Sequence, residues 1–367
     1  MNQIKTAMVG TPCQILAATK INKYSEITGG SPIDIKVGLF CMENFSYTYL
    51  EKFLNQNNIE MYEIKEFRID KGKFLVNLIN GNEFSIPIAE TNVFTRKNCQ
   101  ICTDYTSDLS DISVGSVGSP DGYSTVIVRT EKGQKIINEL KENKLIKCEE
   151  LSEKGLKLLK SIANKKIRTN QKNIESRERV ARQVLSQRHV SEKTLHNQSK
   201  NCQFSNLEAD VISVGGCVLC GACEYVCKSN IIQINDRKPQ AYGECEEDCH
   251  GCYYACPRTY VSTDLLPEDI DSKPFGEYLD ILAVKSNSIN GQDGGVVSGI
   301  LMYLLDKEIV DEVFLVGQDE NNPWKPKSFV SNKVWDVIAA AGTKYSSNLY
   351  TIYTIYHTLI ENIKLDL

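Results

Sequence analysis

The sequence predicts an α/β (α+β) protein with an inserted cysteine-rich module. Strand, loop and helix patterns follow one another in the first 60 residues and again after residue 278, and eight cysteines lie between Cys217 and Cys256. The 367 residues give room for two or three domains. A hydrophobic content of 41% and a charged content of 24% are ordinary for globular proteins.

Charge and composition exclude several classes of function. The chain has 42 basic and 47 acidic side chains, a net charge of −5, which gives no basic surface for nucleic acid. The opening residues lack the features of a signal peptide, and no run of about 18 apolar residues occurs. We therefore expect a cytoplasmic protein without membrane insertion. In that reducing compartment, 14 cysteines indicate metal or redox chemistry rather than disulfides.

The N-terminal segment alternates strand and helix patterns. Residues 4–10 form an apolar, β-prone run, and residues 14–27 have helical spacing. A second strand pattern covers residues 33–41, and an aromatic segment with helical spacing covers residues 45–54. These segments predict two strand–loop–helix units.

The next segments predict a meander, a glycine loop and polar helices. Apolar and polar residues alternate over 61–90, with Lys71-Gly72 and Asn80-Gly81 as turn signals, which predicts antiparallel strands. Residues 111–133 form a glycine-punctuated loop and a β-branched strand, with helix-forming residues from Lys135. Such glycines allow a close approach of ligand, although they more often mark turns. Polar residues 149–205 predict solvated amphipathic helices leading into a linker.

The C-terminal segment predicts a βαβ unit. Strand patterns at 278–286 and 310–317 flank a glycine loop at 291–295 and a helix pattern at 296–308. Such a unit normally makes a right-handed crossover between parallel strands. The glycine loop opens a helix, where backbone N–H groups suit a phosphate, but a loop of this kind is weak evidence alone.

The cysteine-rich module has the spacing of iron–sulfur proteins. One run has gaps of two, two and three residues from Cys217, and the other has gaps of three, two and three from Cys245. Such runs hold cubane clusters, the fourth cysteine of each run ligating the other cluster. The alternative is a pair of zinc sites, which usually take two ligands from each of two knuckles. The predicted ligands are Cys217, Cys220, Cys223 and Cys256 for one [4Fe–4S] cluster and Cys245, Cys249, Cys252 and Cys227 for the other.

Four further cysteines suggest a third site. Cys13 and Cys41 follow predicted strands, and the carboxyl ends of parallel strands share one edge of a sheet. Cys99 and Cys102 form a C-x2-C hook that would complete a four-thiolate cage. The alternative is that these are buried structural cysteines. Cys148 and Cys202 lie in polar surroundings without partners and are predicted to have no function.

Several longer words resemble one family. VGTPCQI, VGLFCMENFSY, KGKF, CQICTDY, DISVGSVGSPDGYSTVIVRTEKG, QDGGVVSGILMYLL and AGTKYS are similar to the family of flavoprotein β-subunits of coenzyme F420-reducing hydrogenases and F420-dependent dehydrogenases. The cysteine module looks like that of the F420H2-oxidising input subunit of membrane dehydrogenases.

The resemblance implies FAD, [4Fe–4S] clusters and a place for coenzyme F420. It places the family's cluster cysteines on Cys13, Cys41, Cys99 and Cys102, giving three clusters in all. The implied flavin contacts are Gly294, Gly295, Val297, Ser298, Lys344, Tyr345, Ser346 and Asn44. Arg129 and Lys344 are the better candidates for the phosphates of FAD or F420, whereas Lys71 and Lys73 are cations near turns for which ordinary surface charge is the simpler interpretation.

The order of the halves departs from the family. There the DGGVVS half precedes the GTPCQ half, whereas here the GTPCQ half comes first. This indicates a circular permutation, or separately encoded pieces numbered as one chain. The resemblance then implies one mixed-sheet flavoprotein domain assembled from both ends of the chain, with the ferredoxin-like module inserted. A permuted chain keeps its contacts if the old termini can be linked, so Met1 and Leu367 are expected to lie close together. The predicted domains are a cluster and coenzyme half (1–148), a polar helical extension and linker (149–206), a 2[4Fe–4S] ferredoxin-like domain (207–262) and a half with the FAD loop (263–367).

The implied function is an oxidoreductase subunit that exchanges a hydride with F420 and passes single electrons to a partner. FAD would convert between the two, since the protein mainly binds and orients such cofactors, and no side-chain acid or base is predicted. The expected partner in a hetero-oligomer is a hydrogenase, a formate dehydrogenase, a membrane dehydrogenase or another reductase. The alternatives are a passive electron-transfer subunit and a related reductase that acts on another substrate.

Overall fold

The computed structural model describes residues 4–235, 238–265, 273–289, 291 and 293–347. Its centre is an eight-stranded mixed sheet with the order β16-β15-β1-β2-β7-β8-β14-β9. The strands are β1 (Thr6–Gly10), β2 (Ile35–Leu39), β7 (Ile112–Gly115), β8 (Ser124–Val128), β9 (Ile146–Glu150), β14 (Asp280–Ser286), β15 (Glu312–Gln318) and β16 (Pro326–Ser331). The predicted assembly of one mixed sheet from both ends of the chain is therefore confirmed.

The two ends of the chain interleave within this sheet. Strands β15, β1, β2 and β7 are parallel, β8 is antiparallel to β7, and β14 lies antiparallel between β8 and β9. The C-terminal strands thus enter the N-terminal sheet at two separate places. The predicted βαβ unit is only partly right: β14 and β15 run parallel but are separated by four strands, because β1, β2, β7 and β8 already occupy the middle.

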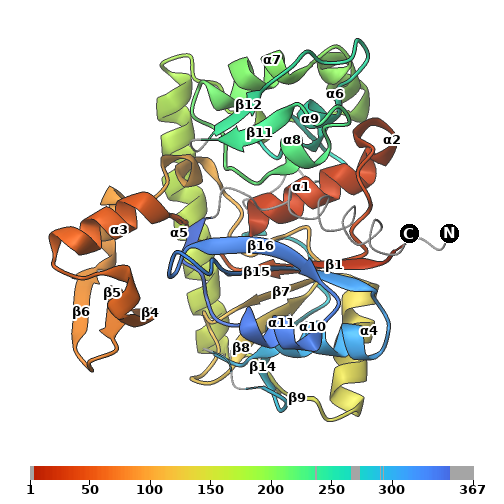
Figure 1. The fold of residues 1–367 in the computed structure, drawn as a ribbon. Helices are drawn as coiled ribbons and strands as arrows, with labels where there is room; N and C mark the ends of the chain where they lie inside the picture. Colours follow the sequence, from red (N-terminus) through yellow and green to blue (C-terminus); the bar gives the residue numbers. More distant parts are fainter. Residues whose placement is uncertain (1–3, 236–237, 266–272, 290, 292, 348–367) are drawn as a thin grey trace.

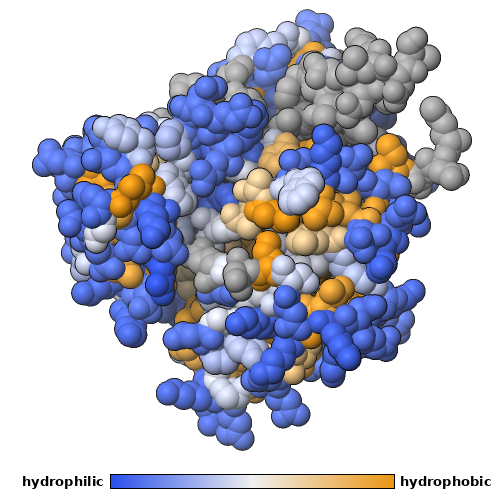
Figure 2. Space-filling model, turned by 60° about the horizontal axis from the view of Figure 1, so that its bottom comes forward, coloured by the Kyte–Doolittle hydropathy of each residue, from blue (hydrophilic) through white to orange (hydrophobic). Residues whose placement is uncertain are grey.

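Helices cover both faces of the sheet (Figure 1). α1 (Pro12–Lys23) lies on one face, and α4 (Glu131–Glu142), α10 (Val296–Asp306) and α11 (Val334–Ala339) lie on the other. Burial on both faces requires continuous apolar strands, and β8 is buried at all five positions. Apolar residues are visible at the surface on the side of the molecule shown in Figure 2. Trp335 of α11 is 77% exposed.

The predicted meander is confirmed as a separate three-stranded sheet. It consists of β4 (Ile64–Asp70), β5 (Lys73–Leu78) and β6 (Glu83–Pro87), all antiparallel. At the first turn Lys71 and Gly72 have φ angles of 45° and 78°, as a two-residue hairpin turn requires. Together with α3 (Tyr47–Gln56), this sheet forms the lobe at the left of Figure 1.

The cysteine module, residues 207–262, lies against the outer side of α1 (Figure 1). Buried Met8, Ala17 and Ile21 share one hydrophobic core with the module's cysteines. The elements in and before it are α6 (Glu192–Ser199), α7 (Phe204–Leu207), α8 (Ala222–Tyr225), β11 (Ile232–Asn235), β12 (Lys238–Ala241), α9 (Gly251–Ala255) and β13 (Val261–Ser262), which pairs with β10 (His189–Val190). The remaining short elements are α2 (Ser25–Thr28), β3 (Phe45–Ser46) and β17 (Ser346–Ser347).

Helix α5 (Glu153–Glu178) changes the interpretation of the polar segment. The helix is confirmed, but it is not merely a solvated lead into a linker, since its inner face is buried and it runs beside both the sheet and the module (Figure 1). A Cβ at Gly155 would lie 2.0 Å from the carbonyl oxygen of Gly118. A Cβ at Gly118 would lie 2.8 Å from the carbonyl oxygen of Gly155, so both glycines allow the loop and α5 to pack closely, which the sequence did not indicate.

Two expectations concern the whole chain. The expected proximity of Met1 and Leu367 concerns two residues that lie outside the described ranges. Among the helices of the described ranges, none is long and apolar enough to cross a membrane.

Candidate functional site

The sheet brings Cys13, Cys41, Cys99 and Cys102 together, and we call them the sheet-edge quartet. Cys13 lies in the first turn of α1 after β1, and Cys41 follows β2, which pairs in parallel with β1. Cys99 lies in a 3-10 helix, Lys97–Ile101. Burial raises the pKa of Cys41, Lys166 opposes this, and the like charges of Cys99, Cys13 and Cys102 raise the pKa further. The four thiols are therefore close neighbours.

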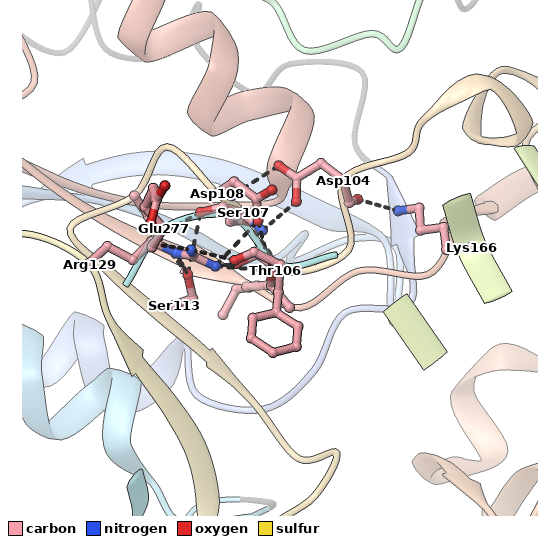
Figure 3. A network of polar contacts seen from close by, with 11 residues as sticks. Asp104, Thr106, Ser107, Asp108, Ser113, Arg129, Lys166 and Glu277 are labelled. Carbon is pink, nitrogen blue, oxygen red and sulfur yellow. Dashed lines mark hydrogen bonds and ion pairs between the residues drawn. The ribbon is translucent and has the colours of Figure 1, made fainter. Parts of the chain in front are cut away.

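A buried lysine from α5 reaches this quartet. Lys166 is 3% exposed, and its Nζ donates to the main-chain carbonyl oxygens of Cys41 and, at 2.7 Å, of Asp104 (Figure 3). Burial lowers the pKa of Lys166, but the thiolates of Cys102 and Cys41 and the carboxylate of Asp104 outweigh it and raise the pKa overall. A protonated lysine thus lies beside this group of cysteines.

One turn further along α5, Asn170 holds the C-x2-C segment. Its Nδ2 donates to the carbonyl oxygens of Cys99 at 3.1 Å and of Cys102 at 2.6 Å. Asn173 donates to the carbonyl oxygen of Gln100 at 3.2 Å. Residues four apart share a helix face, so Lys166 and Asn170 act from one side. Sequence reasoning missed these residues, because polar positions on an amphipathic helix do not show in sequence whether they face water or the protein interior.

The first module quartet consists of Cys217, Cys220, Cys223 and Cys256. Burial raises the pKa of Cys217 to about 11, and the charge of Cys256 adds to the rise. The N–H of Leu219 donates to the Cys217 sulfur at 3.4 Å and acts to lower the pKa. Burial raises the pKa of Cys223 well above its usual value, and Cys217, Cys220 and Cys256 contribute. These four thiols are the set that the spacing predicts.

The second module quartet consists of Cys227, Cys245, Cys249 and Cys252. Burial raises the pKa of Cys252, and the thiolates of Cys245, Cys249 and Cys227 add to the rise. Cys245 and Cys249 are partly exposed, in a segment whose other members Glu246 to Asp248 are exposed. Two members of this quartet therefore lie at an exposed loop, whereas Cys227 and Cys252 are buried.

Neighbouring quartets also act on one another. Burial raises the pKa of Cys220, and Cys13 of the sheet-edge quartet is among the thiols that raise it further. Cys252 likewise adds to the raised pKa of Cys223, after burial. Cys13 and seven of the eight module cysteines also belong to one hydrophobic cluster, and the order of the three quartets in space stays a prediction.

The donor set is sulfur at every position. In the described ranges, no three or more His, Cys, Asp or Glu side chains converge closely enough to hold a single metal ion. Thiolates are ligands of both iron–sulfur clusters and zinc, so the identity of the metal stays a prediction. At the sheet-edge quartet and the first module quartet, cations such as Lys166 and main-chain N–H donors such as that of Leu219 fit clusters that carry negative charge.

The predicted glycine loop packs closely on the sheet. The N–H of Gly294 donates to Ser124 Oγ at 3.1 Å, and its carbonyl accepts from the N–H of Ser286 at 2.7 Å. A Cβ at Gly294 would lie 2.4 Å from the carbonyl oxygen of Val284, and Gly295 has a φ of 66°. These two glycines are thus required by packing and by the turn, while Val297 and Ser298 follow in the first turn of α10. Their contact with a flavin stays a prediction.

The other predicted flavin residues meet at the short strands β3 and β17. Ser346 pairs with Phe45, and the N–H of Phe45 donates to the carbonyl oxygen of Tyr345 at 2.9 Å. Asn44 adjoins the sheet-edge quartet: burial raises the pKa of Cys99, Arg96 opposes this, and a hydrogen bond from the Asn44 backbone also lowers it. Asn44, Tyr345 and Ser346 are therefore brought together beside the quartet.

Lys344 and Arg129 make internal contacts. Lys344 Nζ donates to the carbonyl oxygens of Ala340 at 2.6 Å and of Ala341 at 3.1 Å, at the end of α11, and burial lowers its pKa to about 8. Their roles as cofactor ligands stay predictions. Lys71 and Lys73 are exposed at the first turn of the meander.

The Arg129 guanidinium is 2% exposed and is held inside the chain (Figure 3). It donates to Ser113 Oγ at 2.7 Å, to Thr106 Oγ1 at 2.9 Å and to the carbonyl oxygen of Glu277 at 2.9 Å, and it pairs with Asp108 at 3.3 Å. Contact with a cofactor would require some of these bonds to be exchanged.

Two family models match this chain. The model for the C terminus of the coenzyme F420 hydrogenase/dehydrogenase beta subunit matches residues 4–154, and the model for the N-terminal part of the same protein matches residues 282–352. The two halves therefore occur in the reverse of the family's order, as the order of the GTPCQ and DGGVVS words predicts. Both halves contribute strands to the one central sheet.

Relatives share about half of the chain. The coenzyme F420 hydrogenase subunit beta of Methanococcus voltae is 40% identical over 47% of this chain and 63% of its own length. A component of the F(420)H(2) dehydrogenase of Methanosarcina mazei is 34% identical over 47% of this chain and 48% of its own length. In the solved F420-reducing [NiFe] hydrogenase complex from Methanosarcina barkeri, one chain is 38% identical over 47% of this chain and 61% of its own, with a TM-score of 0.43. This chain thus spans less than two thirds of these proteins.

Proposed function

This chain belongs to the family of coenzyme F420 hydrogenase/dehydrogenase beta subunits, and we propose that it is an oxidoreductase subunit that exchanges a hydride with coenzyme F420 through FAD and single electrons with a partner through three [4Fe–4S] clusters. The observation that carries the proposal is the series of three thiol quartets, each acting on the next. A flavin, when bound, supplies both hydride and one-electron chemistry, which the deazaflavin and the clusters each lack in part.

The sheet-edge quartet would hold the cluster nearest the flavin. Asn44 contacts Cys99 through its backbone, and Tyr345 lies beside Phe45, the residue after Asn44. The family resemblance assigns Asn44 and Tyr345 to the flavin. The chain's own contribution is to hold the quartet in a buried, cationic place, because low exposure and positive charge set a cluster's potential.

The second module quartet supports an exit to a partner. Cys245 and Cys249 are partly exposed, and the residues between them, Glu246 to Asp248, are exposed. An electron carrier near the surface is the natural point of exchange with another protein. The proposed partner is a hydrogenase, a formate dehydrogenase, a membrane dehydrogenase or another reductase, because relatives of this chain are parts of an F420 hydrogenase, an F(420)H(2) dehydrogenase and an F420-dependent formate dehydrogenase.

The test is anaerobic quantification of iron, sulfide and flavin, followed by titration with reduced F420. The proposal expects about twelve irons and one FAD per chain, since each cubane contributes about four irons. F420H2 should then bleach the flavin and cluster absorbance. Clusters without FAD would favour a passive electron-transfer subunit, and FAD with no response to F420H2 would favour a reductase for another substrate. A chain that holds zinc or no metal would overturn the proposal.

A further inference from the structure

A buried arginine lies where the sheet-edge quartet meets the first module quartet. Arg258 comes two residues after Cys256 and is 7% exposed. Its main-chain N–H donates to Cys256 Sγ at 3.4 Å, while its Nη1 donates to the carbonyl oxygen of Ile101 at 3.1 Å and its Nη2 to that of Asn98 at 3.2 Å. One residue of the module therefore holds the segment that carries Cys99.

Arg258 also has a hydrogen-bond donor for which the described residues supply no acceptor. Its Nε is buried and has no hydrogen-bond partner among the described residues. A buried donor without a partner is costly, so each such group requires an explanation. Nη2 of Arg96 is in the same condition in the described part of the chain. Burial raises the pKa of Cys217, whereas Arg96 and Arg258 both act to lower it, so both guanidinium groups face this quartet.

A second buried cation, Lys20, also links the two quartets, in this case from the sheet side to the module. Lys20 lies on α1, the helix that carries Cys13, and is 1% exposed. Its Nζ donates to the carbonyl oxygen of Cys256 at 2.7 Å, to Thr259 Oγ1 at 2.8 Å and to the carbonyl oxygen of Tyr260 at 2.9 Å. The three N–H donors of Lys20 thus all bond to main-chain or hydroxyl oxygens, whereas the Nε–H of Arg258 has no acceptor among the described residues.

We propose that Arg258 is a positioning residue that raises the reduction potential of the cluster held by Cys217, Cys220, Cys223 and Cys256 and fixes the Cys99 segment against it. This inference rests on the proposed function, since it requires clusters at these thiols. Reduction adds a negative charge, which a buried cation stabilises, and hydrogen bonds to the sulfurs act in the same direction. The spare Nε–H is a donor suited to cluster or thiolate sulfur.

Matched variants distinguish the effect of the positive charge of Arg258 from the effect of its planar guanidinium group. Arg258→Gln removes the charge, Arg258→Lys keeps the charge but loses the planar fork, and Arg168→Gln removes an exposed arginine from α5 as a control. Each whole chain is prepared anaerobically, its iron is counted, and its clusters are titrated by EPR at controlled solution potentials. Arg258→Gln should lower the reduced-to-oxidised ratio of one cluster about tenfold at a fixed potential, about 59 mV for a one-electron couple.

The experiment tests the role of Arg258 separately from the proposed function of the chain. Arg258→Lys should give a smaller shift in the same direction, and Arg168→Gln should match the wild type. Full iron content with unchanged potentials in Arg258→Gln would overturn the inference, as would an equal shift of all three clusters. If Arg258→Gln fails to retain clusters, Arg258→Lys decides: a shift in one cluster supports the inference, and none refutes it. A wild-type chain without clusters would instead refute the proposed function.

Discussion

The cysteine module and the sheet-edge quartet place thiols together in different ways. In the module, eight cysteines lie within 40 residues, and main-chain N–H groups of the same loops, such as that of Leu219, donate to their sulfurs. At the sheet edge, the four cysteines come from three separate segments between residues 13 and 102, and α5 holds them from outside. A site encoded in short loops depends on its own segment, whereas an assembled site depends on the packing of distant elements.

The largest effect that separates the two regions is expected from Cys41→Ser. It removes one of four thiols at the sheet edge, so the chain should lose about four of about twelve irons and keep the module clusters. Iron quantification and EPR on the purified variant measure this. Cys148→Ser, outside all quartets, is the control and should retain all the iron. Loss of every cluster in Cys41→Ser would show that the two regions do not assemble independently.

A second, smaller effect is expected from Asn170→Leu. The change removes the donor to the carbonyl oxygens of Cys99 and Cys102. The Cys99 carbonyl still accepts from the N–H of Cys102, whereas the Cys102 carbonyl loses this bond, which typically costs about 1–3 kcal/mol. A chelator should then strip iron from the sheet edge faster than from the module. The exposed Lys172→Met on the same helix should behave like the wild type. Equal rates of release in Asn170→Leu and the wild type would contradict the role of α5.

Gly155→Ala tests the seating of α5 itself. Its Cβ would meet the carbonyl oxygen of Gly118 at 2.0 Å, so helix or loop must move, at a cost of about 1–3 kcal/mol for such overpacking. We expect a lower thermal midpoint and a weakened sheet-edge site with the module spectrum unchanged. Lys160→Ala, on the exposed side of α5, supplies the comparison. A midpoint equal to that of the wild type would mean that the contact relaxes freely.

The smallest effect concerns pH. Burial, with repulsion from Asp104, raises the pKa of Asp108 to about 7, although Arg129 opposes this. The proton is therefore held more tightly in the folded chain, so this contribution to stability is full below about pH 4 and is lost as pH rises through about 7. Asp108→Asn should lessen the fall in unfolding free energy over that range, as denaturant titrations at several pH values would show. The exposed Asp121→Asn should leave the profile unchanged; an unchanged profile in Asp108→Asn would refute the assignment.

Much of the fold was predictable because it depends on short windows of sequence. The strand at 4–10, the meander with its Lys71-Gly72 turn and the helix after residue 295 all occur as periodicity and turn chemistry predict. The helix expected from Lys135 begins earlier, at Glu131, because Thr130 caps it by accepting from the N–H of Gly133. The separation of β14 from β15 was not predictable from any short stretch of sequence, because it depends on strands from the other end of the chain.

The cysteine spacing alone predicts how the eight module thiols divide between two clusters, because the short gaps bring three sulfurs of each run to one point and leave the fourth for the neighbouring cluster. Only the tertiary structure decided that α5 supplies Lys166 and Asn170 to the sheet-edge quartet and that Arg258 and Lys20 cross between two quartets. A polar side chain on an amphipathic helix is the same in sequence whether it faces water or a buried carbonyl. Packing alone assigns the side chain to one or the other.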